Sequence, residues 1–323
     1  MKHIEIDERN SGQRLDRFIS KLMPKMGKNM VQKFIRTKKI KVNKKRSEAD
    51  YILKDTDIVN IYIYDEVIEK YQDKRVYTAD DFNLKVVYED DDIIIIDKPA
   101  GILSHAADKK DYGKNIVDMM VSYLIKRGAF VPAKDSTFTP ALVNRLDRNT
   151  AGLILGAKTY DSLKYFNELF KRREVTKLYE SLVAGRLSTG IIDLSLQKDE
   201  DKNISKVGQA GKKSMTKIIS AEDLGGYSLV RIDLLTGRTH QIRAHLAAIN
   251  NPIIGDIKYG DKKVNSYFQK KYGLNHQLLH SYKLIFPEKM EKYRHLEGRK
   301  FVSKRDSKFD QILKDLRKDR GSK

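Results

Sequence analysis

One aspartate stands in a setting where a side chain could do chemistry. Asp147 lies in the polar stretch 144–150, directly before the apolar run 151–157, and Arg145 and Arg148 flank it. A carboxylate in such a loop could act as a nucleophile, as a base or as a stabiliser of positive charge. The plainer interpretation is a turn aspartate that hydrogen-bonds its own backbone. The residue types and their spacing leave both interpretations open.

Two further segments place a reactive side chain next to an apolar element. Tyr179 lies inside the strand-like run 177–184, where a tyrosine most often serves packing. In the segment 234–246 a strand ends, Gly237 turns the chain, and a helix begins near residue 239. Arg243 falls at the edge of the buried stripe of that helix, between core and solvent. A lone helix arginine is usually a surface residue, so a surface position without a catalytic role is the plainer interpretation of Arg243.

The common cofactor and metal motifs are missing from the sequence. There is no cysteine, which excludes disulfides and thiolate metal sites. His276 and His280 are four residues apart, but no nearby carboxylate completes a metal set around them. The stretch 152–159 lacks the Gly-Lys-Ser/Thr step of a phosphate loop, and no GxGxxG is present. We therefore expect a protein without a metal or a cofactor.

The charge of the chain favours a polyanionic partner. Its 323 residues carry 64 Lys and Arg against 44 Asp and Glu, a net charge of +20, with an isoelectric point near 9.7. Such an excess of basic residues is typical of proteins that bind nucleic acid. The aliphatic runs are too short to span a bilayer, and the acidic N-terminus does not resemble a signal peptide. A cytoplasmic protein is expected.

The first unit, 1–64, reads as a small basic domain. Apolar spacing predicts a helix over 14–22 and a second over 28–38, followed by strands at 40–42 and 58–63. Between residues 17 and 46 there are twelve Lys or Arg and no acid, whereas ordinary surfaces mix both signs. We expect this run to contact phosphates. The candidate RNA-binding residues in it are Lys28, Lys33, Arg36, Lys38, Lys39, Lys44, Lys45 and Arg46.

The rest of the chain divides into a linker, a large domain and a tail. The polar stretch 65–80 lacks periodicity and reads as a linker, and a second domain spans 81–300. Its strand-like runs and helical spacings predict an α+β fold with a mainly antiparallel mixed sheet flanked by helices. The segment 301–323 reads as a basic C-terminal tail, either a charged terminal helix or a loose arm. The expected strands lie at 84–88, 93–96, 151–157, 177–184 and 227–235, and the expected helices at 160–170 and 239–249.

Together the three segments resemble the RluA-type pseudouridine synthases. That family reads HRLDxxTSGLLL, KxYxAxVxG and LxTGRTHQIRxHL where this chain has NRLDRNTAGLIL, KLYESLVAG and LLTGRTHQIRAHL. The stretches DKPAG at 97–101 and GDIKYGD at 255–261 extend the resemblance over residues 84–286. The latter stretch, with GLNHQLLHSY after it, looks most like the RluC branch. The first unit resembles the α-L RNA-binding module of ribosomal proteins.

The resemblance implies a fold, a reaction and roles for particular residues. The reaction breaks the bond between ribose and uracil N1, turns the base and rejoins it through C5, and it needs no cofactor. Asp147 would be the catalytic aspartate, acting on the sugar in one of the three ways given above. Arg243 would pair with it, Tyr179 would stack on the uracil and help to remove the C5 proton, and Arg145 would support base flipping. The implied RNA-binding residues of this domain are Arg145, Arg148, Arg238, Thr239 and His240.

The implied function is conversion of specific uridines to pseudouridine in large-subunit (23S) ribosomal RNA. The partner would be that RNA or a pre-ribosomal particle, and a monomer is the default. Asn144 and Ala151 stand where the family has histidine and serine. These two differences bear on the choice of target uridine more than on activity. A synthase acting on transfer RNA and a catalytically silent ribosome assembly factor remain the alternatives. A DNA-binding regulator is disfavoured because no helix-turn-helix pair is evident.

Overall fold

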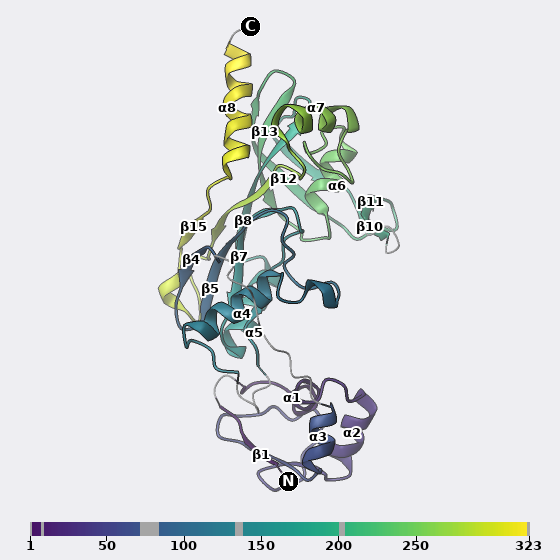
Figure 1. The fold of residues 1–323 in the computed structure, drawn as a ribbon, viewed down its shortest axis with the longest axis vertical. Helices are drawn as coiled ribbons and strands as arrows, with labels where there is room; N and C mark the ends of the chain where they lie inside the picture. Colours follow the sequence, from purple (N-terminus) through teal and green to yellow (C-terminus); the bar gives the residue numbers. More distant parts are fainter. Residues whose placement is uncertain (1, 8–9, 72–83, 133–137, 200–203, 322–323) are drawn as a thin grey trace.

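A computed structural model describes residues 2–7, 10–71, 84–132, 138–199 and 204–321. The N-terminal unit has its own core and lies at one end of the molecule (Figure 1). It contains β1 (Lys2–Glu5), α1 (Leu15–Leu22), α2 (Lys28–Arg36), β2 (Ile40–Val42), β3 (Ile58–Ile61) and α3 (Asp65–Tyr71). The three strands form an antiparallel sheet in the order β1-β3-β2. The apolar stripe of α1, formed by Leu15, Phe18, Ile19 and Leu22, is buried against this sheet and α2.

The segment expected as a linker begins with structure. Within 65–80, residues Asp65–Tyr71 form α3, and Ile68 is buried in the N-terminal core. This helix of about two turns was too short to show a helical period in the sequence. The remaining residues of that segment, 72–80, lie outside the described part of the chain.

The second unit is built on one large mixed sheet, as the sequence predicted. Its strand order is β4-β5-β7-β14-β8-β13-β12-β9, with β6 paired to β7 and β15 paired to β14. All these pairs are antiparallel except β14 with β7. The strands are β4 (Val86–Glu89), β5 (Ile93–Lys98), β6 (Ala141–Leu142), β7 (Ala151–Ala157), β8 (Thr176–Ala184), β9 (Gly190–Asp193), β12 (Met215–Asp223), β13 (Tyr227–Leu234), β14 (Leu279–Ile285) and β15 (Lys300–Val302). A separate hairpin pairs β10 (Leu196–Asp199) with β11 (Ile204–Val207).

Helices cover both faces of this sheet, which explains its continuous apolar strands. Ile94 and Ile96 point into the core shared with α4 (Ile116–Lys126), while Ile93 and Ile95 point into the core shared with α5 (Tyr160–Arg172). All four isoleucines are 0% exposed, because successive strand residues face opposite sides and both sides are packed. Two more helices follow, α6 (Gln241–Ala248) and α7 (Lys262–Tyr272), and short 3-10 turns lie at Lys109–Asp111 and Arg294–Leu296.

The C-terminal segment forms a helix, one of the two forms that the sequence suggested, and this helix packs on the second unit. Residues Lys300–Val302 form β15, and Ser307–Gly321 form α8, drawn in yellow in Figure 1. Four apolar residues of α8 at helical spacing are buried against α7 and the sheet: Phe309, Ile312, Leu313 and Leu316. The many charges of this segment hid that stripe. The second unit therefore continues past residue 300.

The two units touch at a small contact beside α5. Asn10 Oδ1 accepts a hydrogen bond of 3.0 Å from the Phe138 amide, and Lys21 Nζ lies 5.0 Å from the centre of the Tyr160 ring. In the described part of the chain, every helix is too short or too polar to cross a membrane.

Candidate active site

The loop between β6 and β7 carries Asp147 and is fixed on both sides of it. Leu146 donates its amide to Ser104 Oγ at 3.1 Å, and the Ser104 hydroxyl donates to the Leu146 carbonyl at 2.7 Å. Asn144 Oδ1 accepts from the Leu155 amide at 2.7 Å, which ties the start of the loop to β7. The Thr150 amide donates to the Asp147 carbonyl at 3.1 Å, as in a turn. The loop thus presents the Asp147 carboxylate from a rigid support.

A buried lysine holds the far side of the same loop. Lys98, at the end of β5, is 0% exposed and donates to the carbonyls of Pro99, Ile102 and Arg148 at 2.7–2.8 Å. Burial lowers the pKa of its ammonium to about 7, while the charge of Asp147 acts in the opposite direction. All three ammonium protons are used to join the stretch 99–102 to the Asp147 loop. Lys98 therefore positions the loop without reaching the cleft.

Arg243 joins two carboxylates. Its Nε and Nη2 donate to Asp256 at 2.6 and 2.8 Å, and its Nη1 donates to Asp147 Oδ2 at 2.9 Å. Asp256 is 0% exposed, whereas the Asp147 side chain is 28% exposed and open to the cleft. Burial opposes the charge of Arg243, but the hydrogen bonds and charges of the two aspartates raise its pKa above the ordinary value. Asp147 therefore always faces a cation.

Tyr179 enters the cleft from the central strand β8. Its ring is in the core beside β13, where Tyr179 pairs with Ile232, and the residue is 5% exposed. Burial raises the pKa of its hydroxyl to about 12, so the phenol keeps its proton at neutral pH.

The start of α6 forms the opposite rim. Gln241 anchors the turn, because its amide donates to the Met215 carbonyl at 2.9 Å and its oxygen accepts from Thr236 Oγ1 at 2.6 Å. His240 has a φ of 52° and places Nε2 at 3.8 Å from Asp147 Oδ2. Its Nδ1 lies 3.1 Å from the Tyr259 hydroxyl. Burial lowers the pKa of His240, partly offset by Asp147.

These residues line one cleft of about 1130 Å³, which is large enough for a nucleotide. The cleft brings together all three candidate catalytic residues and all five RNA-binding candidates of this domain. They are Asp147, Tyr179, Arg243, Arg145, Arg148, Arg238, Thr239 and His240. Arg145, Arg148, Arg238 and Thr239 are exposed on its walls.

The eight basic candidates of the N-terminal unit lie apart from the cleft. Lys28, Lys33, Arg36, Lys38, Lys39, Lys44, Lys45 and Arg46 are all exposed, on α2 and the turns that follow it. Arg46 is paired with Glu48 at 3.4 Å, and Lys39 lies over the Phe34 ring. The unit that carries them is at the opposite end of the molecule from α8 (Figure 1).

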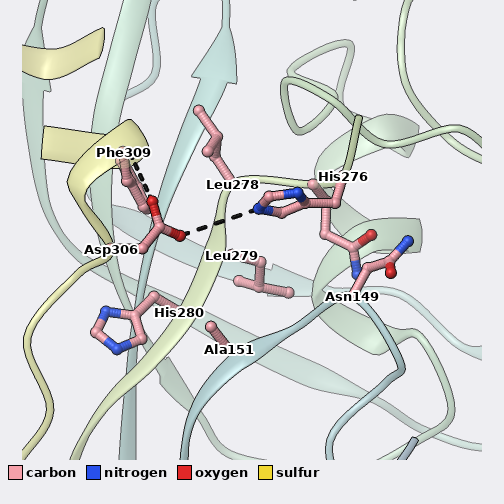
Figure 2. Close-up of a pocket in the computed structure, with 9 residues that line it drawn as sticks. Asn149, Ala151, His276, Leu278, Leu279, His280, Asp306 and Phe309 are labelled. Atoms are coloured by element: carbon pink, nitrogen blue, oxygen red, sulfur yellow. Dashed lines mark hydrogen bonds and ion pairs between the residues drawn. The ribbon is translucent and has the colours of Figure 1, made fainter. Parts of the chain in front are cut away.

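A second, smaller pocket lies behind the Asp147 loop. Figure 2 shows His276 facing Asp306, at the start of α8, with an Nε2 to Oδ2 distance of 4.0 Å. Asn149 and Ala151 line the same pocket. His276 lies in a loop and His280 in β14, so the two histidines do not share a helix face.

Comparisons with known proteins show the family to which the chain belongs. A family model described as RNA pseudouridylate synthase matches residues 92–248. An uncharacterised RNA pseudouridine synthase of Mycoplasma genitalium is 32% identical over 88% of each chain. The chain belongs to the RNA pseudouridine synthase family.

Two further similar proteins add to this comparison. One covers almost the whole chain, and the other is a solved structure that shows the fold. Ribosomal large subunit pseudouridine synthase C of Haemophilus influenzae is 31% identical over 98% of this chain and 95% of its own. The structure of human RNA pseudouridylate synthase domain containing 4 matches with a TM-score of 0.56 and 24% identity. That match covers 72% of this chain and 93% of the human one, and it confirms the predicted pseudouridine synthase fold.

Sequence reasoning about this pseudouridine synthase missed three residues that surround the site. Asp256 and Tyr259 lie in the stretch GDIKYGD, and Lys98 lies in DKPAG. Both stretches were noticed for their resemblance, but no partner could be assigned because Arg243 and Asp256 are brought together only by the turn after α6. The Tyr259 ring lies 5.0 Å below the Arg243 guanidinium and completes its enclosure.

Proposed function

We propose that the chain isomerises specific uridines of large-subunit ribosomal RNA to pseudouridine. The observation that carries the proposal is the pairing of Asp147 with Arg243 at 2.9 Å in an open cleft beside Tyr179. The choice of RNA is supported by relatives named ribosomal large subunit pseudouridine synthase C over almost the whole chain. The enzyme would act in the cytoplasm as a monomer, on free RNA or on a pre-ribosomal particle.

The side chains divide the work as follows. Asp147 acts at the ribose, where the bond to N1 breaks and the bond to C5 forms. Arg243 orients the carboxylate, because its Nη1 donates to Asp147 Oδ2 while Asp256 holds the other side of the guanidinium. Tyr179 packs against the uracil, and its neutral hydroxyl takes part in moving the C5 proton. Arg145 fills the space that the flipped base leaves in the RNA.

The N-terminal unit would supply affinity. We propose that residues 1–64 act as an α-L RNA-binding domain that contacts backbone phosphates of folded RNA through its exposed lysines and arginines. The domain from residue 81 onward would carry out catalysis.

The decisive experiment is tritium release from ribosomal RNA that is transcribed with 5-tritiated uridine. The native protein is expected to release tritium, and Asp147→Asn is expected to release none. Asp91→Asn, which removes an exposed carboxylate from the β4–β5 turn, serves as the control and should match the native rate. Tritium release from transfer RNA but not from ribosomal RNA would show that the substrate is transfer RNA. No release from either RNA, despite tight binding, would indicate an assembly factor.

A further inference from the structure

A second basic group lies in the cleft, formed by residues to which no role has been assigned above. Arg173 and Lys177 line the same wall as Tyr179, together with Phe170 and Lys171. Arg173 follows α5 directly, and Lys177 is the second residue of β8. Because strand residues two apart face the same side, Lys177 and Tyr179 project from β8 into the same cleft.

Lys171 is paired with a carboxylate, whereas Arg173 and Lys177 form no ion pair with a described residue. Lys171 and the adjacent Arg172 both pair with Glu168, at 3.2 and 3.3 Å. Among the described residues, no carboxylate oxygen lies within 4.0 Å of Arg173 or Lys177. Lys177 is half-buried, and its Nζ is held 5.2 Å from the centre of the Phe170 ring.

Two features show that this arrangement costs stability in the free protein. Burial lowers the pKa of Lys177, and the like charge of Arg173 lowers it further, while the charge of Asp233 acts in the opposite direction. Arg173 adopts a φ of 64°, a left-handed conformation at the C-terminus of α5 that favours glycine. An anion between the two side chains would relieve the repulsion and replace the lost hydration.

We propose that Arg173 and Lys177 form a subsite for a backbone phosphate of the RNA strand that carries the target uridine. The inference rests on the proposed function, since it assigns the ligand of the same cleft. A phosphodiester is the anion that every nucleotide supplies, and Arg and Lys are its usual protein partners. Lying beside Tyr179, the subsite would hold the strand next to the flipped base and fix its register.

The test uses variants that remove charge without disturbing the fold. Arg173→Gly suits the left-handed backbone, so it should keep or raise the melting temperature while it removes the guanidinium. Lys177→Gln keeps the length of the side chain. Arg172→Gln is the matched control. It removes the same charge at the neighbouring position, and the Arg172 side chain pairs with Glu168 outside the cleft.

Binding of each variant to an unmodified large-subunit rRNA transcript is measured across a salt series. For Arg173→Gly with Lys177→Gln, affinity at low salt should fall about 10- to 100-fold, and the slope of log affinity against log salt should fall by about one to two. Arg172→Gln should change affinity by less than about twofold. If Lys177→Gln does not fold, Arg173→Gly alone should lower the slope by about one.

Failure of this inference differs from failure of the proposed function. Native tritium release together with a native salt slope in the double variant would overturn the subsite and leave the function intact. Absence of release by the native protein from every RNA would overturn the function. In that case the salt slopes still decide whether the two side chains contact phosphate.

Discussion

Asp256 holds Arg243 by two nitrogens and thereby leaves Nη1 as the nitrogen that meets Asp147. The bidentate pair, at 2.6 and 2.8 Å, prevents the guanidinium from rotating. The direction of the 2.9 Å hydrogen bond from Nη1 to Asp147 is therefore fixed as well. The buried carboxylate of Asp256, which does not line the cleft, thus sets the direction of the hydrogen bond that Asp147 receives.

Arg243→Ala should destabilise the protein as well as silence it. The change leaves Asp256 buried and unpaired, which typically costs roughly 3–5 kcal/mol of unfolding free energy. Urea unfolding and tritium release measure the two effects. Arg238→Ala, which removes an exposed arginine from the same cleft, is the control and should unfold like the native protein. An active Arg243→Ala enzyme with an unchanged melting temperature would refute the role of the pair.

Tyr179→Phe should bind RNA as the native protein does but turn over more slowly. The ring remains to pack in the cleft, while the hydroxyl that we propose for proton transfer is lost, which should lower kcat by about 10²-fold or more. Single-turnover tritium release and equilibrium binding separate the two effects. Tyr282→Phe, on the neighbouring strand β14, serves as the control. Full turnover by Tyr179→Phe would remove the hydroxyl from the mechanism.

Arg145→Ala should impair activity on structured RNA more than on single strands. Arg145 is exposed in the cleft two residues before Asp147, where it can fill the gap left by a flipped base. Flipping out of a stack costs a few kcal/mol, so kcat/KM on a hairpin should fall about 10- to 100-fold more than on an unpaired strand. Arg148→Ala should lower both by similar factors. Equal losses for Arg145→Ala on the two substrates would contradict the assignment.

His240 should make stability depend on pH below about 6.5. Burial lowers its pKa from 6.5, so at pH values between the folded-state pKa and 6.5 the unfolded chain binds more protons than the folded one. The unfolding free energy therefore rises as pH rises through this window, by at most about 1.4 kcal/mol per pH unit for one proton. His240→Gln should flatten this rise. His105→Gln, which removes an exposed ring, should leave it unchanged.

Such a comparison is made by chemical unfolding at several pH values. Other buried histidines contribute to the slope of the native protein, so the difference between His240→Gln and the native chain is the quantity that matters. Parallel stability curves for the two proteins would show that His240 does not titrate differently in the folded state.

The sequence by itself determined most of the elements that support the site. Apolar spacing predicted α1 and α5, and apolar runs predicted β5 and β7. The reason is that burial of a face requires apolar residues at the spacing of the helix or strand that presents it. The sequence also singled out Asp147, Tyr179 and Arg243, since each lies in a motif that is long enough to be specific to one family. The charge excess in residues 17–46 marked an exposed basic face on the N-terminal unit.

The tertiary structure decided how those residues meet. Asp147 and Arg243 are 96 residues apart, and their contact depends on strand order, which local periodicity does not encode. The same holds for Lys98, whose ammonium is buried only because β5 and β7 are neighbours, and for α8, whose apolar stripe is hidden among charges until α7 covers it. Local patterns specify elements, whereas burial and ion pairing between distant segments exist only once the chain has folded.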